Sequence, residues 1–212
     1  MEIITSKKQK TMSVAIVKYN AGNLFSVKCA LARIGVDAVV SDDERVLKAA
    51  DRVIFPGVGE ASTAMAYLRE KGLDRVIKEL HQPVLGICIG LQLMCATSEE
   101  GNATCLGIFD NIGVRRFSSD GLLEPLKIPH MGWNTISLAK PNALIDESLE
   151  GEFVYYVPSF YAPVSKEFTV ATTTYGTEYS AVLNNNNFFA TQFHPEKSGA
   201  VGERILENFM RL

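Results

Sequence analysis

A cysteine flanked by glycines is the residue whose setting in this sequence most favours chemistry. Cys88 follows an apolar run over residues 83–87 and precedes a helical pattern, with Gly86 and Gly90 two positions away on either side. A sharp turn from strand to helix strains the backbone, which small neighbours tolerate, and exposes the turn residue at the carboxyl end of a sheet. The amides that open the helix then favour the thiolate. The pattern therefore predicts a nucleophile rather than a small apolar filler.

The other three cysteines lack this setting. Cys29, Cys95 and Cys105 fall in helical or loop patterns, and no CxxC pair occurs. A chain of 212 residues does not need disulfide bonds to fold. We interpret all four cysteines as free thiols, and we predict neither a metal site nor a cofactor.

A histidine and a carboxylate leave the predicted strand over residues 188–193 together. His194 lies at the strand end, where it could take the Cys88 proton and later return it to a leaving group. Pro195 restricts the backbone so that Glu196 can hold the imidazole in a useful orientation and tautomer. A surface turn is the alternative for this tripeptide alone. Its combination with the cysteine turn favours a catalytic triad.

A glycine-rich loop over residues 56–60 (PGVGE) lies between a predicted strand and a predicted helix. The loop superficially resembles a dinucleotide fingerprint, but the third glycine is missing and no acidic residue follows a second strand at the required distance. An oxyanion hole suits the cysteine chemistry better. We assign it to one amide of residues 57–59, that of Val58, and to the amide of Ile89. One such donor is worth about 3 kcal/mol in the transition state.

The elements that must position these groups alternate between strand and helix up to about Thr97. Strand-like runs cover residues 14–19, 37–40, 52–55 and 84–87, and helical patterns cover residues 23–34, 61–80 and 89–97. This alternation predicts βαβ units and a parallel sheet.

The second half of the chain changes character. Short alternating segments stand between glycine, proline and asparagine, at residues 112–117, 134–138, 152–157, 168–175, 179–183 and 188–193. They predict a strand-rich half with mixed or antiparallel pairing. The four asparagines at residues 184–187 are typical of a hairpin tip. Residues 201–212 place apolar side chains at helical spacing and predict a closing amphipathic helix.

Composition narrows the classes of function. The chain is 47% hydrophobic, has a formal net charge of -3 and carries no basic stripe, so we expect neither nucleic acid nor an anionic membrane as a partner. No apolar run approaches the ~20 residues that span a bilayer, and no secretory signal is evident. We expect a cytoplasmic protein with a flexible tail at residues 1–11 and a single domain at residues 12–212.

Three segments, residues 56–60, 86–92 (GICIGLQ) and 192–199 (QFHPEKSG), resemble in order and spacing the class I, triad-type glutamine amidotransferases. Two more, residues 21–24 (AGNL) and 129–134 (PHMGWN), are similar to the glutaminase subunits of imidazole glycerol phosphate synthases. The resemblance covers nearly the whole chain. It implies an α/β, flavodoxin-like fold with a mostly parallel central sheet flanked by helices and a strand-rich second half.

The resemblance also implies hydrolysis of glutamine to glutamate and ammonia within a heterodimer. Cys88 would be the nucleophile, His194 the base and Glu196 its orienter. A (β/α)8-barrel cyclase subunit would receive the ammonia in histidine biosynthesis. The other family positions carried over are substrate contacts at Gly57, Gly59, Gln92, Glu100, Ser159 and Phe160, and partner contacts at Asn23, Trp133, Asn134 and Lys197.

Two places depart from the family pattern. Residues 18–20 (KYN) stand where Asp-Tyr-Gly is common, and Pro158 stands where a histidine is common. Both belong to partner-facing or substrate-adjacent loops and leave the triad intact. Three other functions stay open at this point: the glutaminase module of another synthase such as anthranilate synthase, a catalytically silent regulatory subunit, and a thiol hydrolase that acts alone.

Overall fold

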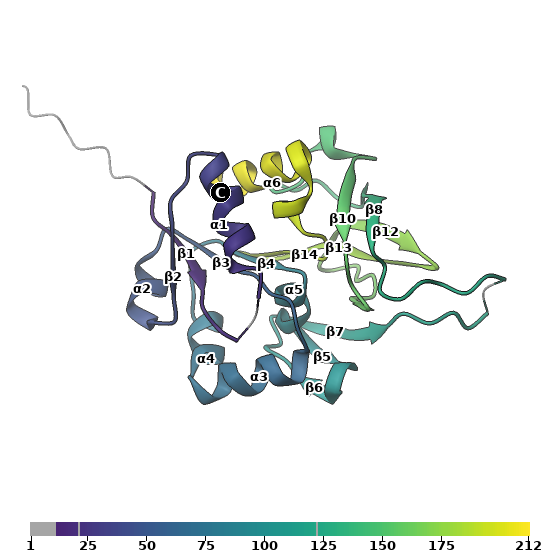
Figure 1. Ribbon diagram of the computed structural model, residues 1–212, viewed down its shortest axis with the longest axis horizontal. Coiled ribbons are helices and arrows are strands. Elements are labelled where there is room, and N and C mark those ends of the chain that lie inside the picture. The colour runs from purple at the N-terminus through teal and green to yellow at the C-terminus, as the bar shows by residue number, and fades with distance from the viewer. Residues whose placement is uncertain (1–11, 21, 122) are drawn as a thin grey trace, which may run out of the picture.

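The computed structural model describes residues 12–20, 22–121 and 123–212. Helices cover both faces of a central sheet, and the second half of the chain adds further strands at one end of it (Figure 1). The predicted tail, residues 1–11, and Ala21 of the AGNL segment lie outside the described residues.

Strands and helices alternate through the first half, as the sequence predicts. The elements are β1 (Val14–Val17), α1 (Leu24–Arg33), β2 (Ala38–Ser41), α2 (Glu44–Ala49), β3 (Arg52–Phe55), α3 (Ala61–Glu70), α4 (Leu73–Lys78), β4 (Val84–Ile87) and α5 (Ile89–Met94). Helix α2 is not among the helices predicted from the sequence. This short helix is capped by Asp43, whose carboxylate accepts a hydrogen bond from the Arg45 amide over 2.8 Å.

Two predicted helices are wrong in extent. The run over residues 61–80 breaks at Gly72, which has a left-handed φ of 69° and stands as the N-cap of α4. The helix predicted over residues 89–97 ends at Met94, and the next four residues form β5 (Cys95–Ser98). Strand β5 pairs with β6 and β7, so tertiary pairing overrides the local helical pattern.

The second half is strand-rich, also as predicted. Its elements are η1 (Glu100–Asn102), β6 (Ala103–Thr104), β7 (Phe109–Arg116), β8 (Gly132–Thr135), β9 (Ser137–Leu138), η2 (Glu147–Leu149), β10 (Phe153–Tyr156), β11 (Phe160–Tyr161), β12 (Thr169–Tyr175), β13 (Thr177–Asn185), β14 (Phe188–Thr191), η3 (Pro195–Lys197) and α6 (Gly199–Arg211), where η marks a 3₁₀ turn. The asparagine run connects β13 to β14, which confirms the predicted hairpin tip.

The main sheet has the strand order β2-β1-β3-β4-β14-β13-β12-β9. Its first five strands are parallel, and the other three pair antiparallel. The order 2-1-3-4, continued by a fifth parallel strand, is the flavodoxin-like arrangement, which binds ligands at the carboxyl ends of its strands. β14 comes from the far end of the chain and lies parallel to β4. The segments that follow these two strands therefore leave the sheet at the same edge. Two smaller sheets, β10-β8 and β11-β7-β5-β6, complete the fold.

The core consists of two apolar clusters, one on each face of the main sheet. Along β1, Val14 and Ile16 belong to the cluster that includes α1 and α6, whereas Ala15 and Val17 belong to the cluster that includes helices α2 to α5. Side chains alternate across a strand, so a strand covered on both faces reads as a continuous apolar run. Figure 1 shows these two helical layers above and below the sheet.

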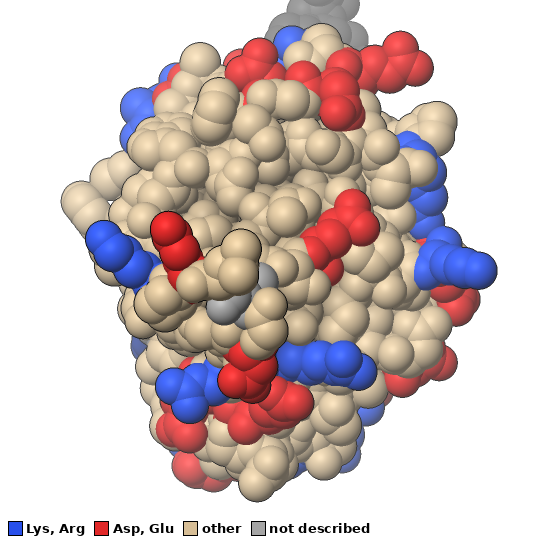
Figure 2. All heavy atoms as spheres, turned by 90° about the vertical axis from the view of Figure 1, so that its right-hand side faces the viewer, with Lys and Arg blue, Asp and Glu red and all other residues tan. Residues whose placement is uncertain are grey.

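The face at the strand-rich end carries acidic and basic side chains interspersed around uncharged surface (Figure 2). Among the described residues, none of the helices has the length and apolarity needed to cross a bilayer. The cytoplasmic location stays a prediction.

Candidate active site

Cys88 lies at the junction of β4 and α5 with φ 55° and ψ -106°, a backbone conformation that non-glycine residues rarely adopt. Such strain costs on the order of 1–3 kcal/mol and persists only where the surrounding structure enforces it. Gly90 shows how tightly this turn is packed, because a Cβ at that position would lie 1.9 Å from the Phe55 carbonyl oxygen. The glycine therefore lets α5 start directly against the end of β3.

His194 is brought to Cys88 by the parallel pairing of β14 with β4. Thr191 is in register with Ile87, and the Cys88 amide donates to the Thr191 carbonyl over 2.8 Å. The chain then turns, and the His194 amide donates to the Tyr155 carbonyl over 2.9 Å. His194 and Cys88 thus line the same cavity although they are far apart in the sequence.

Glu196 orients the imidazole from the short η3 turn. Its Oε1 lies 2.7 Å from Nδ1 of His194, and both side chains are buried. The Asn23 side-chain amide donates to the same Oε1 from the start of α1. Ser198 supports the turn by donating to the His194 carbonyl over 2.7 Å. The carboxylate is therefore held by two donors from different elements, and the ring orientation follows from it.

The charges at this site favour a protonated imidazole. Burial lowers the pKa of His194, but the negative charge of Cys88 and the interaction with Glu196 outweigh burial and raise it to about 10. Nδ1 is engaged by Glu196, while Nε2 has no hydrogen-bond partner among the described residues. Nε2 is therefore the ring atom that can exchange a proton with sulfur or substrate.

A cavity of about 160 Å³ opens above the sulfur. At ~30 Å³ per water molecule, this is the volume of about five waters, the scale of one small solute. The described residues that line it are Val58, Gly59, Cys88, Ile89, Gln92, Glu100, Val157, Pro158, Ser159, Phe160 and His194. The cavity therefore brings together five of the six predicted substrate contacts with both predicted oxyanion residues and two members of the triad.

Gly57 is the predicted substrate contact that is not in this lining. A Cβ there would lie 2.0 Å from the Tyr19 hydroxyl oxygen, so the glycine lets the 56–60 loop pack against the segment that follows β1. The Tyr19 hydroxyl donates to the Pro56 carbonyl over 2.7 Å. Burial, followed by the nearby charge of Cys88, raises the pKa of Tyr19 far above its ordinary value, so the phenol remains a donor. Tyr19 thereby fixes the start of the loop.

Two predicted substrate contacts, Glu100 and Gln92, also form hydrogen bonds within the protein. The Glu100 carboxylate accepts a hydrogen bond from the Ala61 amide over 2.8 Å, at the start of α3, and burial raises its pKa. The Gln92 amide donates to the Phe160 carbonyl over 3.1 Å. Each side chain therefore contributes to the cavity wall and fixes a neighbouring element at the same time.

The predicted partner contacts lie close to the triad. Trp133 is 54% exposed and packs edge-on against Tyr155, with ring centres 5.8 Å apart. The Lys197 ammonium lies 6.0 Å from the centre of the same Tyr155 ring. Asn134 is partly buried and donates to the Thr174 carbonyl over 2.9 Å. The Tyr155 carbonyl accepts a hydrogen bond from the His194 amide. Tyr155 therefore contacts both Trp133 at the surface and His194 in the site.

Gln192 lies at the site but is not among the site residues predicted from the sequence. Its side chain is fully buried, and its Nε2 lies 3.9 Å from Sγ of Cys88. A signal was present, since residues two apart along an extended segment point to the same side, and Gln192 stands two positions before His194.

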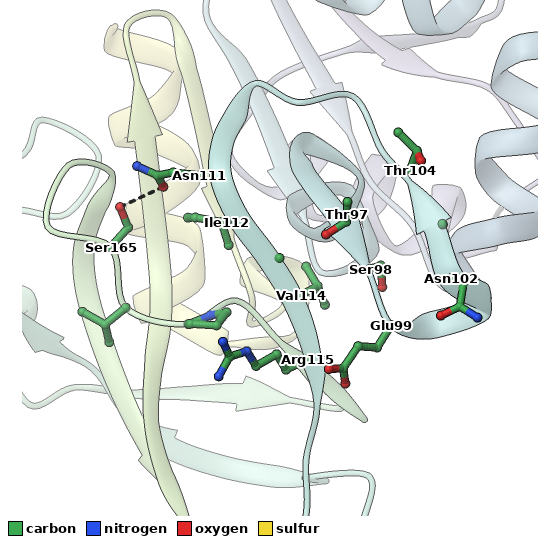
Figure 3. Close-up of a pocket in the computed structure, with 14 residues that line it drawn as sticks. Thr97, Ser98, Glu99, Asn102, Thr104, Asn111, Ile112, Val114, Arg115 and Ser165 are labelled. Atoms are coloured by element: carbon green, nitrogen blue, oxygen red, sulfur yellow. Dashed lines mark hydrogen bonds between the residues drawn. The ribbon is translucent and has the colours of Figure 1, made fainter.

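A larger cavity, of about 610 Å³, lies along β5 and β7. Figure 3 shows side chains such as Thr97, Asn111, Arg115 and Ser165 around it. Among the described residues, its lining includes neither cysteine nor histidine, and no group of three His, Cys, Asp or Glu side chains is arranged to hold a metal. Size alone therefore does not select the candidate site, whereas the side-chain chemistry around Cys88 favours the smaller cavity.

Comparison with known proteins agrees with this geometry. The family model for class-I glutamine amidotransferases matches residues 12–212. A solved structure described as a glutamine amidotransferase superposes with a TM-score of 0.70 at 18% identity, covering 94% of this chain and 98% of that one. The chain therefore belongs to the class-I glutamine amidotransferase family.

Curated relatives narrow the assignment. Imidazole glycerol phosphate synthase subunit HisH of Bacteroides fragilis is 61% identical over 201 residues, which cover 95% of this chain and all of the relative. The same subunit of Bacteroides thetaiotaomicron is 56% identical over 202 residues, with 95% of this chain and all of the relative covered. Within its family, the chain groups with the HisH subunits.

Replacing Cys88, the predicted nucleophile, should change the titration of His194, the predicted base. Cys88→Ala removes the largest influence that raises the pKa of His194, so we expect its ring to titrate at lower pH in an NMR titration. A raised pKa stabilises the fold fully below the ordinary value of 6.5, and that contribution is lost as pH rises through about 10. The variant should therefore show a flatter dependence of unfolding free energy on pH in this window.

The matched control for this titration is Cys29→Ala, which removes a half-buried thiol on α1 outside the cavity. It should leave the His194 titration where it is in the unsubstituted chain. An identical His194 titration in Cys88→Ala would contradict the proposed sulfur–imidazole pair.

Proposed function

We propose that this chain is the glutaminase subunit of an imidazole glycerol phosphate synthase and that Cys88, His194 and Glu196 carry out its chemistry. The observation that carries the proposal is the convergence of the three side chains at one edge of the sheet, with a cavity the size of one small solute above the sulfur. Identity of 61% to a HisH subunit over nearly the whole chain supports the choice of synthase.

The reaction begins at the Cys88 thiolate, which attacks the side-chain amide carbon of glutamine. A carbon–sulfur bond forms, and the carbonyl becomes a tetrahedral oxyanion. His194, protonated at Nε2, gives its proton to the amide nitrogen, the carbon–nitrogen bond breaks and ammonia leaves. Water deprotonated by His194 then attacks the glutamyl thioester, which releases glutamate and returns the thiolate. Glu196 holds the tautomer and orientation of the ring through both halves of the reaction.

The oxyanion requires donors on the cavity wall. Val58 and Ile89 both line the cavity beside Cys88. Ile89 is the first residue of α5, and the first amides of a helix have no intrahelical acceptor, so they are available to an anion. We assign these two amides to the oxyanion hole, each worth about 3 kcal/mol in the transition state. Gly59, in the same loop, has a φ of 129°, which glycine adopts without the steric cost that other residues would have.

Glutamine binds in this cavity. Gln92 and Glu100 contribute polar side chains to its lining, and Ser159 and Phe160 contribute backbone groups. Pro158, the departure from the family pattern, lines the cavity as well, and its carbonyl accepts a hydrogen bond from the His130 amide over 2.9 Å. That bond fixes the loop in the absence of the usual histidine.

The ammonia is delivered to a cyclase subunit, which we take to be a (β/α)8 barrel. Phe25, two residues after Asn23, is 79% exposed, and Trp133, which packs on Tyr155, is 54% exposed. A contiguous patch of exposed apolar side chains is typical of a protein interface. A barrel that covers Asn23, Trp133, Asn134 and Lys197 would close the cavity and keep ammonia from water.

The rival functions have weaker support. The hydrogen bond between His194 and Glu196, with Cys88 and His194 on the same cavity, argues against a silent regulatory subunit. High identity to HisH subunits argues against the module of a different synthase and against a hydrolase that acts alone.

Replacement of the nucleophile tests the chemistry. We expect Cys88→Ala to lower glutamate release from glutamine by ~10⁴-fold or more, because the other triad members have no nucleophile to activate. The assay is run on the purified chain with and without the cyclase subunit and its phosphorylated ligand, and the unsubstituted chain should be strongly stimulated by both.

Cys105→Ala is the control for this assay, since it removes another buried thiol outside the cavity. Full activity in Cys88→Ala would refute the proposed mechanism. High activity that the cyclase leaves unchanged would refute the proposed partner while leaving the glutaminase chemistry intact.

The interface is tested at Trp133. Trp133→Ala should raise the dissociation constant for the cyclase by about 30-fold, the effect expected of a central aromatic residue worth about 2 kcal/mol. Binding is measured by isothermal titration calorimetry. Val39→Ala, which truncates a 60% exposed apolar side chain on β2, the edge strand at the other end of the main sheet, should bind as the unsubstituted chain does. Equal affinities for all three proteins would place the interface elsewhere.

A further inference from the structure

Two glutamine side chains are buried between the substrate loop and the nucleophile. Gln92 is 3% exposed and Gln192 is fully buried. Their amides contact each other, with Nε2 of Gln92 lying 3.4 Å from Oε1 of Gln192. Burying an amide is costly unless it is hydrogen-bonded. The hydrogen-bond partners of Gln92 and Gln192 therefore indicate what these two buried amides do.

The direction of the two amides follows from one backbone carbonyl. Nε2 of Gln92 lies 3.1 Å from the Phe160 oxygen, which can only accept, so this end of Gln92 must be the donor. The same NH₂ group gives its other proton to Gln192, whose facing atom must then be the acceptor oxygen. The NH₂ group of Gln192 is thereby directed at Sγ of Cys88, 3.9 Å away.

A donor that the surrounding bonds hold against sulfur favours the charged form of that sulfur. Hydrogen bonds to ionised groups are roughly twice as strong as neutral ones, and catalytic hydrogen bonds are often long in the free enzyme and shorten when substrate binds. Glutamine binding along the 157–160 loop would act on the Phe160 carbonyl at the other end of this chain of amides. His194 and Gln192 thus contact the nucleophile by different means, one transferring a proton and the other only donating a hydrogen bond.

We propose that Gln192 is a second donor to the Cys88 sulfur, and that the chain Phe160–Gln92–Gln192–Cys88 stabilises the thiolate and links it to the loop that binds glutamine. This inference rests on the proposed role of Cys88 as the nucleophile. It adds a residue for which the triad mechanism has no role. If Gln192 only filled space, methionine could replace it without an effect on the sulfur. If Gln192 donates a hydrogen bond, the same replacement should change the titration of the sulfur.

The test is the pH dependence of Cys88 alkylation by iodoacetamide in the full-length chain, followed by peptide mass spectrometry. Gln192→Met keeps the approximate volume and removes the donor, and we expect its alkylation midpoint to move up by about one pH unit. Gln192→Glu keeps the shape and places a carboxylate against the sulfur, so its midpoint should move further in the same direction. Should the methionine variant fail to fold, Gln192→Leu, which also lacks the donor and adds no charge, carries the test in its place.

Ser180→Ala is the matched control. It removes a fully buried hydroxyl from neighbouring β13, where Ser180 donates to the Pro163 carbonyl over 2.9 Å, and it should leave the midpoint unchanged. Unchanged midpoints in the folded Gln192 variants would overturn the inference, even if their alkylation rates fell. Failure of the proposed function would be seen separately, as glutaminase activity that persists in Cys88→Ala.

Discussion

The hydrogen bond from the Cys88 amide to the Thr191 carbonyl is the constraint on which the site depends. It closes the parallel pairing of β14 with β4, and that pairing places the segment after Thr191 beside the turn after Ile87. This one strand placement brings Gln192 and His194 to the cavity or side chain of Cys88, and it brings Glu196 to His194. The flavodoxin-like order supplies the rest, because every parallel strand of such a sheet ends at the same edge.

The same constraint accounts for the strain at the nucleophile. A positive φ at Cys88 would relax if the turn were free to move, but the turn is held from three directions. Phe55 closes in on Gly90, Thr191 binds the Cys88 amide, and Tyr19 holds the loop that carries Val58. The interactions that bury the sheet therefore maintain the conformation that exposes the sulfur to the cavity. Stability and reactivity share the same contacts here.

Local signals explain what the sequence could predict. The glycines around Cys88 and the histidine and carboxylate at a strand end are short motifs, and β-type runs between helical patterns define the sheet. The pairing that makes β5 a strand could not be predicted in this way, because it depends on residues distant in sequence. The break of the 61–80 helix at Gly72 was different, since a left-handed glycine at a helix end is a local signal, which was overlooked. Asn23, predicted from resemblance to face a partner, also donates to Glu196, which no local pattern indicates.

The central claim is that the sulfur of Cys88 carries the glutamyl group, and the most direct measurement is mass spectrometry of the chain quenched in acid during glutamine turnover. We expect a glutamyl thioester on the peptide that contains Cys88 and on none of the peptides that contain Cys29, Cys95 or Cys105. Glutamate release without an adduct on Cys88, under conditions in which thioester hydrolysis limits the rate, would contradict the mechanism and point to a different nucleophile.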